Sequence, residues 1–249
     1  MRSFDYVRPA TVADAVAAGA EPGAAYLAAG TNLVDLMKGG IARPSRLVDV
    51  TYLPGLDRIE PLPDGGIRIG ALVRNAALAH DPEFARDYPA VAEALLSGAS
   101  AQLRNAATVG GNLLQRTRCS YFHDLTSACN RREPGTGCAA RGGENRLHAV
   151  LGWSEGCIAT HPSDFCVPLV ALDAVVEIEG KGGRRELPLE QLHRLPGTHR
   201  SGTARSPLAI SSSQSACRPQ QAALRRMRAI SRSASARPMR LPSCRPRRH

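Results

Sequence analysis

Four cysteines have a spacing that suits a large metal centre. Cys119, Cys129, Cys138 and Cys157 are separated by nine, eight and eighteen residues, in a stretch rich in glycine and arginine. A structural zinc ion usually takes cysteines in pairs about two to four residues apart, and that pairing is missing here. Converging thiolates on a long loop favour a cubane iron–sulfur cluster, with buried inert thiols as the alternative. Cys166 lies beside a predicted strand and is expected to belong to the core.

Two glycine turns could hold the two ends of a dinucleotide-sized ligand. The first, Gly30-Thr31-Asn32, follows an apolar run over residues 24–29 and precedes a helical pattern that begins at Leu33. Backbone N–H groups at such a strand–turn–helix junction form a cradle for a pyrophosphate. The second turn, over residues 108–112, has a similar glycine–asparagine pattern between apolar runs. Ordinary structural turns are the alternative, and neither turn carries the Gly-x-Gly-x-x-Gly fingerprint of a Rossmann site.

Short helices and short strands alternate along the first 195 residues and must position these groups. Apolar residues at helical spacing predict helices, and apolar runs beside glycine turns predict strands. The expected helices are residues 11–18, with Thr11 as the N-cap, and 88–99; the expected strands are 24–29, 47–50, 56–60, 67–71, 169–179 and 185–189. This mixture predicts an α+β fold.

The net charge of +10 belongs to the C-terminal segment and not to the body of the chain. Residues 200–249 contain 12 arginines, no lysine and no acidic residue, so residues 1–199 carry 20 basic and 22 acidic residues. A near-neutral body predicts a protein or small-molecule partner and no nucleic-acid partner. No run approaches the roughly 18 apolar residues that span a bilayer, so no membrane partner is expected.

After Gly197 the composition changes abruptly to Ser, Arg, Ala and Pro. Such a segment buries too little apolar surface to offset the entropy lost on ordering it. Residues 198–249 are therefore expected to be a basic, low-complexity tail: either a genuine disordered arm or the product of out-of-frame translation of a GC-rich gene. We favour out-of-frame translation, because the change is abrupt and falls inside an apparent domain.

Six sequence strings are similar to one family of flavoproteins. They are AAGTNLVDLMK, GALVRN, GASAQLRNAATVGGNLLQRTRC, CNRREPGTGC, RLHAVLG and EGCIATHPSD, all within residues 1–195. On these strings the chain resembles the FAD-binding medium subunit of the xanthine dehydrogenase and aldehyde oxidoreductase group of molybdenum hydroxylases. Within that group it is most similar to the periplasmic aldehyde oxidoreductase type, which carries an additional [4Fe-4S] cluster.

The resemblance implies an α+β, two-subdomain FAD-binding fold of the molybdenum hydroxylase flavoprotein type, truncated at the C-terminus. Residues 1–55 would form the first FAD-binding subdomain. Residues 56–197 would form an incomplete second FAD-binding subdomain with an iron–sulfur loop over residues 116–166. The tail over residues 198–249 would lie outside this fold.

The resemblance also implies the cofactors FAD and a [4Fe-4S] cluster and assigns residues to each. The turn that holds the FAD pyrophosphate would consist of Leu27, Ala28, Ala29, Gly30, Thr31, Asn32 and Leu33. Thr108, Gly111 and Asn112 would flank the flavin on its second side, and Asp164 would contact the FAD. The ligands of the cluster would be Cys119, Cys129, Cys138 and Cys157.

The function implied by the resemblance is that of an electron-transfer subunit, which passes electrons from iron–sulfur centres through FAD to an external acceptor. Its partners would be a molybdenum-cofactor large subunit, which hydroxylates the substrate, and a [2Fe-2S] small subunit. The N-terminus lacks the apolar core of a signal peptide, so the chain would reach the periplasm with an exported partner or stay in the cytoplasm. The alternatives are a zinc-loop protein whose basic tail contacts nucleic acid, and a nonfunctional truncated product.

Overall fold

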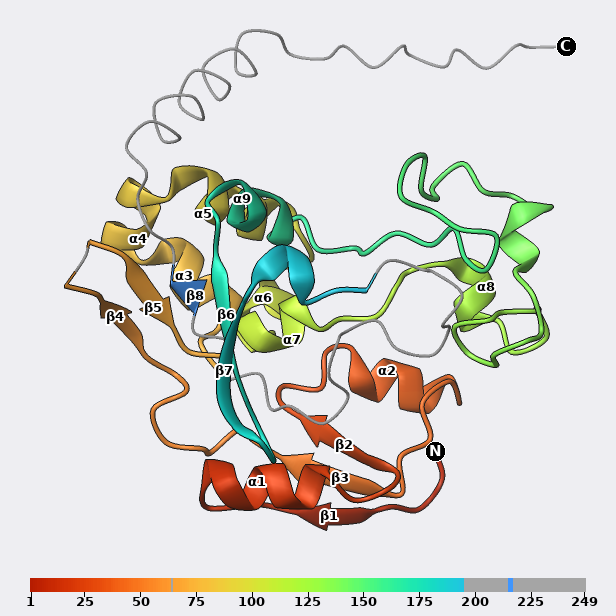
Figure 1. Cartoon of the computed structure of the whole chain (residues 1–249), viewed down its shortest axis with the longest axis horizontal. Helices are drawn as coiled ribbons and strands as arrows, with labels where there is room; N and C mark the ends of the chain where they lie inside the picture. The colour runs from red at the N-terminus through yellow and green to blue at the C-terminus, as the bar shows by residue number, and fades with distance from the viewer. Residues whose placement is uncertain (64, 195–214, 217–249) are drawn as a thin grey trace, which may run out of the picture.

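A parallel sheet is built from the first 50 residues of the chain. The computed structural model describes residues 1–63 and 65–194, together with the backbone of residues 215–216. Three strands pair in the order β1-β3-β2, and all are parallel. They are β1 (Asp5–Val7), β2 (Ala24–Leu27) and β3 (Arg46–Asp49), connected by helices α1 (Val12–Gly19) and α2 (Leu33–Lys38). Parallel strands need such crossovers, so each helix lies between two strands in the sequence (Figure 1).

The helix predicted over residues 11–18 and the strands predicted over residues 24–29 and 47–50 are confirmed, with β2 ending at Leu27, whereas β1 was not predicted. The hydroxyl oxygen of Thr11 accepts a hydrogen bond from the N–H of Asp14 at 3.1 Å, which caps α1. Val48, in the central strand, is completely buried and packs with Ala15 and Val16 of α1. The apolar face of α1 therefore covers the sheet and fixes the direction in which β2 delivers the first glycine turn.

A second group of elements follows in the sequence. An antiparallel hairpin, β4 (Ile59–Pro61) and β5 (Ile67–Ile69), leads into a series of short helices. These are α3 (Asn75–His80), α4 (Pro82–Asp87), α5 (Pro89–Ser97), α6 (Ala101–Ala106) and α7 (Val109–Leu113). The predicted hairpin and the predicted helix over residues 88–99, which ends at Gly98, are both confirmed.

The cysteine segment, defined here as residues 116–160, has little regular structure. It contains only the short helix α8 (Ser120–His123) and the 3-10 turn η1 (Ala139–Arg141) among its described residues. Figure 1 shows it as a lobe beside the body of the molecule, next to α2. Phe122 and Cys129 pack against Leu36 of α2 in a small apolar cluster, which attaches the lobe to the first sheet.

After the cysteine segment the chain forms helix α9 (Cys166–Ala171). The strands β6 (Val175–Gly180) and β7 (Gly183–Pro188) and the 3-10 turn η2 (Leu189–Gln191) follow. The prediction of one continuous strand over residues 169–179 is therefore wrong in its first half. The helix ends at Ala171, and Asp173 has φ +53°, a left-handed conformation that changes the direction of the chain. Cys166 accordingly begins a helix and does not lie beside a strand.

β6 is the middle strand of the second half of the molecule. It pairs antiparallel with β7 and, at Val175 and Val176, with the two-residue strand β8 (Ser215–Ala216). Apart from that backbone pairing, the basic tail expected over residues 198–249 lies outside the described residues. The boundaries expected for the two subdomains stay a prediction. Among the described residues, no helix has the length and apolarity needed to cross a membrane.

A buried carboxylate connects the two antiparallel hairpins. Glu177 on β6 has a side chain that is only 3% exposed, and it forms ion pairs with Arg68 of β5 at 3.2 Å and with Arg184 of β7. A buried carboxylate is stable only when its charge is compensated and its oxygens accept hydrogen bonds. Both conditions are met here, because each guanidinium also donates a hydrogen bond to Glu177.

Candidate functional site

The two glycine turns line one cavity. Its volume is about 170 Å³, and it lies where the end of β2 meets the start of α7. The residues that line it are Tyr26, Ala28, Ala29, Gly30, Thr31, Asn32, Leu33, Val50, Ala71, Leu72, Thr108, Gly110, Gly111 and Leu114. The expectation that both turns contribute to one ligand site therefore agrees with their position in the fold.

The first turn offers hydrogen-bond donors to this cavity. Gly30 has φ +76°, a left-handed conformation that favours glycine, and a Cβ atom there would lie 2.8 Å from Cγ2 of Val34. No acceptor among the described residues is found for the backbone N–H groups of residues 31–33. Residues 31–33 are half-buried and line the cavity, so three neighbouring amide donors at the start of α2 suit an acidic or otherwise oxygen-rich ligand.

The second turn uses its own N–H groups within the protein. The N–H of Gly110 donates to the carbonyl of Ala71 at 2.8 Å, and the N–H of Gly111 donates to the hydroxyl of Thr108 at 3.2 Å. A Cβ atom on Gly110 would lie 3.1 Å from the carbonyl oxygen of Ala71. These glycines therefore let α7 pack closely against the segment after β5, and the second turn forms a wall of the cavity rather than a set of donors.

Asn32 and Asn112 hold neighbouring segments to the two turns. The side-chain oxygen of Asn32 accepts a hydrogen bond from the N–H of Arg116 at 3.1 Å, which connects the first turn to the start of the cysteine segment. The side-chain oxygen of Asn112 accepts from the hydroxyl of Ser163 at 2.6 Å and from Gln115 at 3.0 Å. Both asparagines thus have structural partners in the protein.

Three predicted residues do not line the cavity: Leu27, Asn112 and Asp164. Asp164 is exposed, although its neighbour Ser163 is buried and bonded to Asn112. Tyr26, Val50, Ala71, Leu72 and Leu114 also line it but were not predicted as site residues, and Gly110 was predicted only as part of the second turn. Val50 and Leu72 also pack in the apolar core, so their type alone gave no sign of a second role.

The four widely spaced cysteines meet around one small cavity. Cys119, Cys129, Cys138 and Cys157 all line a narrow space of about 10 Å³ in the cysteine segment. Cys129 and Cys138 come together because their backbones form an isolated antiparallel bridge. All four thiols are free, and none is paired in a disulfide. The structure therefore brings together the set that the spacing and the resemblance singled out, and Cys166 lies outside it.

Polar nitrogen atoms lie close to two of these sulfurs. Nε of Arg131 lies 3.3 Å and the N–H of Ala159 lies 3.4 Å from Sγ of Cys157. Nε2 of His148 lies 3.1 Å from Sγ of Cys119. Burial raises the pKa of the Cys119 thiol, and the neighbouring Cys129 and Cys138 raise it further despite backbone hydrogen bonds to its sulfur.

A buried cation lies close to the same group. The guanidinium of Arg116 stacks over the ring of Phe122 at 5.1 Å, and its Nε is buried without a hydrogen-bond partner. Burial lowers the pKa of Arg116, the charge of Arg131 lowers it further, and Cys129 acts in the opposite direction. A buried cation without a counter-charge is costly, so this environment suits an anionic centre held by the cysteines.

The spread of the four sulfurs distinguishes between metal centres. A single tetrahedral zinc ion, with Zn–S bonds of about 2.3 Å, would hold its sulfurs about 3.8 Å apart. Among the described residues, only His161, Cys166 and His193 form a group of three potential metal ligands. One ligand atom of each lies within 4.8 Å of those of the other two. No three of the four cysteine sulfurs are therefore that close, and the group suits a centre larger than one ion.

The sequence and the fold both match known flavoprotein domains. Residues 2–207 match the family described as "FAD binding domain in molybdopterin dehydrogenase". The chain is 54% identical over 199 residues to the aldehyde oxidoreductase FAD-binding subunit PaoB of Escherichia coli (strain K12), covering 79% of this chain and 62% of that protein. It is 30% identical over 192 residues to the 6-hydroxypseudooxynicotine dehydrogenase complex subunit alpha of Paenarthrobacter nicotinovorans, covering 76% and 50%.

Solved structures share the fold at lower identity. Quinoline 2-oxidoreductase from Pseudomonas putida 86 aligns with a TM-score of 0.62 and 20% identity over 88% of this chain and 60% of that chain. Cu,Mo-CO dehydrogenase aligns with a TM-score of 0.61 and 24% identity over the same shares. The chain thus spans about half to two thirds of the length of these relatives. The predicted α+β fold of the molybdenum hydroxylase flavoprotein type is confirmed, and the chain belongs to the family of FAD-binding domains of molybdopterin dehydrogenases.

Proposed function

We propose that this chain is the FAD-binding, electron-transferring part of a molybdenum-dependent dehydrogenase complex, and that its FAD lies in the cavity between the two glycine turns. The shared cavity supports this proposal most directly. Both turns line it, and the N–H groups of the first turn have no hydrogen-bond acceptor among the residues that the structure describes. FAD, when bound, supplies the redox chemistry, accepting electrons and releasing them singly or in pairs.

The residues of the chain would bind and orient that cofactor. The N–H groups of residues 31–33 and the hydroxyl of Thr31 would donate hydrogen bonds to phosphate oxygens, with Gly30 allowing close approach. Gly111, at the second turn, presents no side chain and leaves room for the ligand. The apolar side chains of Val50 and Leu114 would exclude water from the opposite side.

We further propose that Cys119, Cys129, Cys138 and Cys157 hold a [4Fe-4S] cluster. The donor set fits such a cluster: four free thiols line one cavity, and no three of their sulfurs lie within 4.8 Å of one another. Four thiolates bring more negative charge than the iron core offsets, which matches the buried Arg116 and the donor Arg131. His148 and the N–H of Ala159 would orient and stabilise the sulfurs that they contact.

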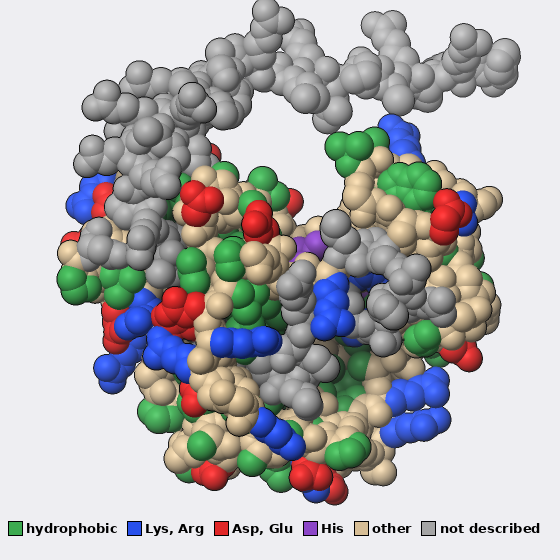
Figure 2. All heavy atoms as spheres, viewed as in Figure 1, with side chains coloured by type: hydrophobic (Ala, Val, Ile, Leu, Met, Phe, Trp, Pro, Cys, Tyr) green, Lys and Arg blue, Asp and Glu red, His purple; other side chains and the backbone are tan. Residues whose placement is uncertain are grey.

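An exposed apolar surface supports assembly with other subunits. The apolar patch consists of Leu147, Val150, Leu151 and Trp153, of which the first three are 84–88% exposed. Figure 2 shows hydrophobic side chains gathered on the outer end of the cysteine-segment lobe. Clustered apolar side chains at a surface mark interaction sites. The relatives named above are subunits of complexes, and we propose a molybdenum-cofactor large subunit and a [2Fe-2S] small subunit as partners.

FAD titration of the purified full chain tests the first proposal. We expect flavin fluorescence to be quenched at one FAD per chain, and Gly30→Ala to weaken binding because it strains the left-handed turn that presents the N–H groups. Gly98→Ala is the matched control, since its new methyl group would meet no atom closer than 3.8 Å. Equal FAD affinity in both variants, or no binding by the parent chain, would contradict this placement of the cofactor.

Iron analysis and the absorption spectrum test the cluster proposal. We expect about four iron atoms per chain and a brown colour, both lost in Cys129→Ser. Cys166→Ser is the control, because Cys166 does not line the cavity of the four cysteines and should leave the iron content unchanged. If the parent chain is colourless and these cysteines bind one zinc ion, the segment is a zinc-binding loop and the cluster proposal is wrong.

A further inference from the structure

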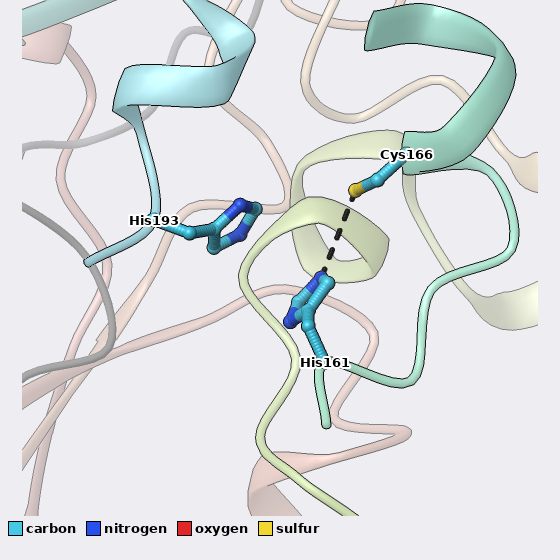
Figure 3. Close-up of side chains that lie close together, drawn as sticks. All are labelled: His161, Cys166 and His193. Carbon is cyan, nitrogen blue, oxygen red and sulfur yellow. Dashed lines mark hydrogen bonds between the residues drawn. The ribbon is translucent and has the colours of Figure 1, made fainter. Parts of the chain in front are cut away.

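Two histidines and a cysteine from three separate segments meet outside both sites described above. His161 lies in the extended segment that follows the cysteine segment, Cys166 is the first residue of α9, and His193 follows η2. Figure 3 shows their side chains converging from these three segments. One potential ligand atom of each lies within 4.8 Å of those of the other two.

The distances suit one metal ion. Sγ of Cys166 and Nε2 of His161 are 3.7 Å apart. In a tetrahedral zinc site with Zn–S of about 2.3 Å and Zn–N of about 2.0 Å, the sulfur and the nitrogen are about 3.5 Å apart. The two side chains therefore already have the separation of two ligands of one ion, and only small side-chain movements would be needed to bind it.

The third residue has one ring nitrogen held by the backbone and the other free to bind a metal. Nε2 of His193 lies 2.7 Å from the carbonyl oxygen of Leu113, which places the ring proton on Nε2 and leaves the lone pair on Nδ1. A backbone carbonyl that accepts the second ring N–H is a common partner of metal-ligating histidine, because it fixes the tautomer and the ring orientation. The ring of His193 lies 4.1 Å from that of His161, at an angle of 37°.

Both imidazoles are held in the neutral form that a metal requires. Burial lowers the pKa of His161 to about 4, with further lowering by the charges of His193 and Arg131. Burial also lowers the pKa of His193, although the hydrogen bond to Leu113 opposes this. Burial raises the pKa of the Cys166 thiol, so a bound cation would have to displace its proton, as is usual for cysteine ligands.

We propose that His161, Cys166 and His193 bind a divalent zinc-type ion, with the fourth position open to water. One thiolate and two imidazoles form a borderline-soft ligand set that suits zinc and not magnesium or calcium. Figure 2 shows histidine side chains between the α9 region and the cysteine-segment lobe, and both His161 and His193 are partly exposed. The ion would join the end of the cysteine segment, the start of α9 and the end of the last hairpin.

Zinc binding by the purified full chain tests this site. We expect the parent chain to take up one zinc ion in addition to any iron, and zinc to raise its Tm. Cys166→Ser and His193→Gln should lose this ion or bind it more than about tenfold more weakly. His80→Gln is the matched control, because His80 is an exposed residue at the end of α3. Zinc uptake by both ligand variants equal to that of the control would overturn the proposal.

Two further measurements separate a loss of zinc binding from a loss of folding, and the proposed site from the cysteine segment. The unfolding temperature in EDTA shows whether a variant is folded; we expect Cys166→Ser and the parent to differ little there, and to diverge only when zinc is added. Cys129→Ser should lose iron and keep the zinc ion. If zinc uptake is lost in Cys129→Ser and retained in Cys166→Ser, zinc binds in the cysteine segment and the proposed site is wrong.

Discussion

At the scale of single residues, similar glycine turns perform different tasks because their amide groups have different partners. The N–H groups of residues 31–33 have no acceptor among the residues described, whereas those of Gly110 and Gly111 bond within the protein. The first turn is therefore equipped to bind a ligand and the second to pack a helix closely. A mutation of Gly30 should therefore change FAD affinity, whereas a mutation of Gly110, whose Cβ would lie against Ala71, should mainly change stability.

Asp49 provides a residue-scale prediction about pH. It is 4% exposed and accepts hydrogen bonds from Thr51, from the hydroxyl of Tyr6 and, at 3.1 Å, from Arg8. Burial raises its pKa, but the hydrogen bonds from Thr51 and Tyr6 outweigh burial, so the pKa is lowered. A lowered pKa in the folded state gives stability that is complete above about pH 4, the unfolded value, and is lost as the pH falls through the folded value.

Asp49→Asn should therefore lower the free energy of unfolding by about 1–3 kcal/mol at pH 7 and by less at pH 3. Urea unfolding of the purified chain at both pH values measures this. Asp57→Asn, at an exposed position, is the control and should change stability little at either pH. A loss that is equal at pH 3 and pH 7 would show that the charge of Asp49 does not stabilise the fold.

Residue types and spacing predicted the candidate sites only in part. The four cysteines could be singled out because thiols are rare and chemically distinct, and they do line one cavity. Val50 and Leu72 could not be predicted as lining residues of the first cavity, because the sequence does not indicate which cavity an apolar side chain faces. Cys166 was expected to be a core residue; it is buried, but its histidine neighbours come from positions 5 and 27 residues away.

At the scale of elements, the buried ion pairs of Glu177 hold two hairpins together. Arg68→Met keeps most of the side-chain volume and removes one of the two charges that compensate the carboxylate. We expect it to lower the free energy of unfolding by about 1–3 kcal/mol, since Glu177 is almost completely buried. Chemical denaturation followed by circular dichroism measures the loss.

Arg86→Met is the matched control for that prediction. Arg86 forms a pair with Asp87 at 2.8 Å, but both side chains are more than half exposed. Exposed pairs contribute about 0–1 kcal/mol, so this variant should remain close to the parent. If the two variants are destabilised equally, burial of Glu177 does not strengthen its ion pairs in the way proposed.

Helix and strand types could be predicted where the local signal was unambiguous. Thr11 gave the start of α1, and the glycine turn at residues 64–66 gave the β4–β5 hairpin. The stretch over residues 169–179 was wrongly assigned to one strand, because its first four residues are all apolar, show no period and fit a buried helix equally well. Three residues, 172–174, separate α9 from β6, and the left-handed conformation of Asp173 among them is hard to predict from residue type.

At the scale of the whole molecule, the apolar patch predicts where other subunits bind. Leu147→Ser combined with Leu151→Ser removes two side chains that are 88% and 87% exposed, so the isolated chain should keep its stability and its iron content. Association with the proposed molybdenum-cofactor and [2Fe-2S] subunits should weaken by more than about tenfold, because apolar contacts dominate interface cores. Co-purification and analytical ultracentrifugation measure this; undiminished association would place the interface elsewhere.

The cysteine segment leaves and re-enters the body of the protein at two neighbouring points. Asn112, just before it, and Ser163, just after it, are 51 positions apart in the sequence and yet share a hydrogen bond of 2.6 Å. A segment whose two ends lie next to each other can be inserted, deleted or exchanged during evolution without changing the path of the flanking chain. A short linker between residues 114 and 161 should therefore give a minimal flavodomain, provided that Leu36, which would lose its contacts with Phe122, is replaced by a polar residue.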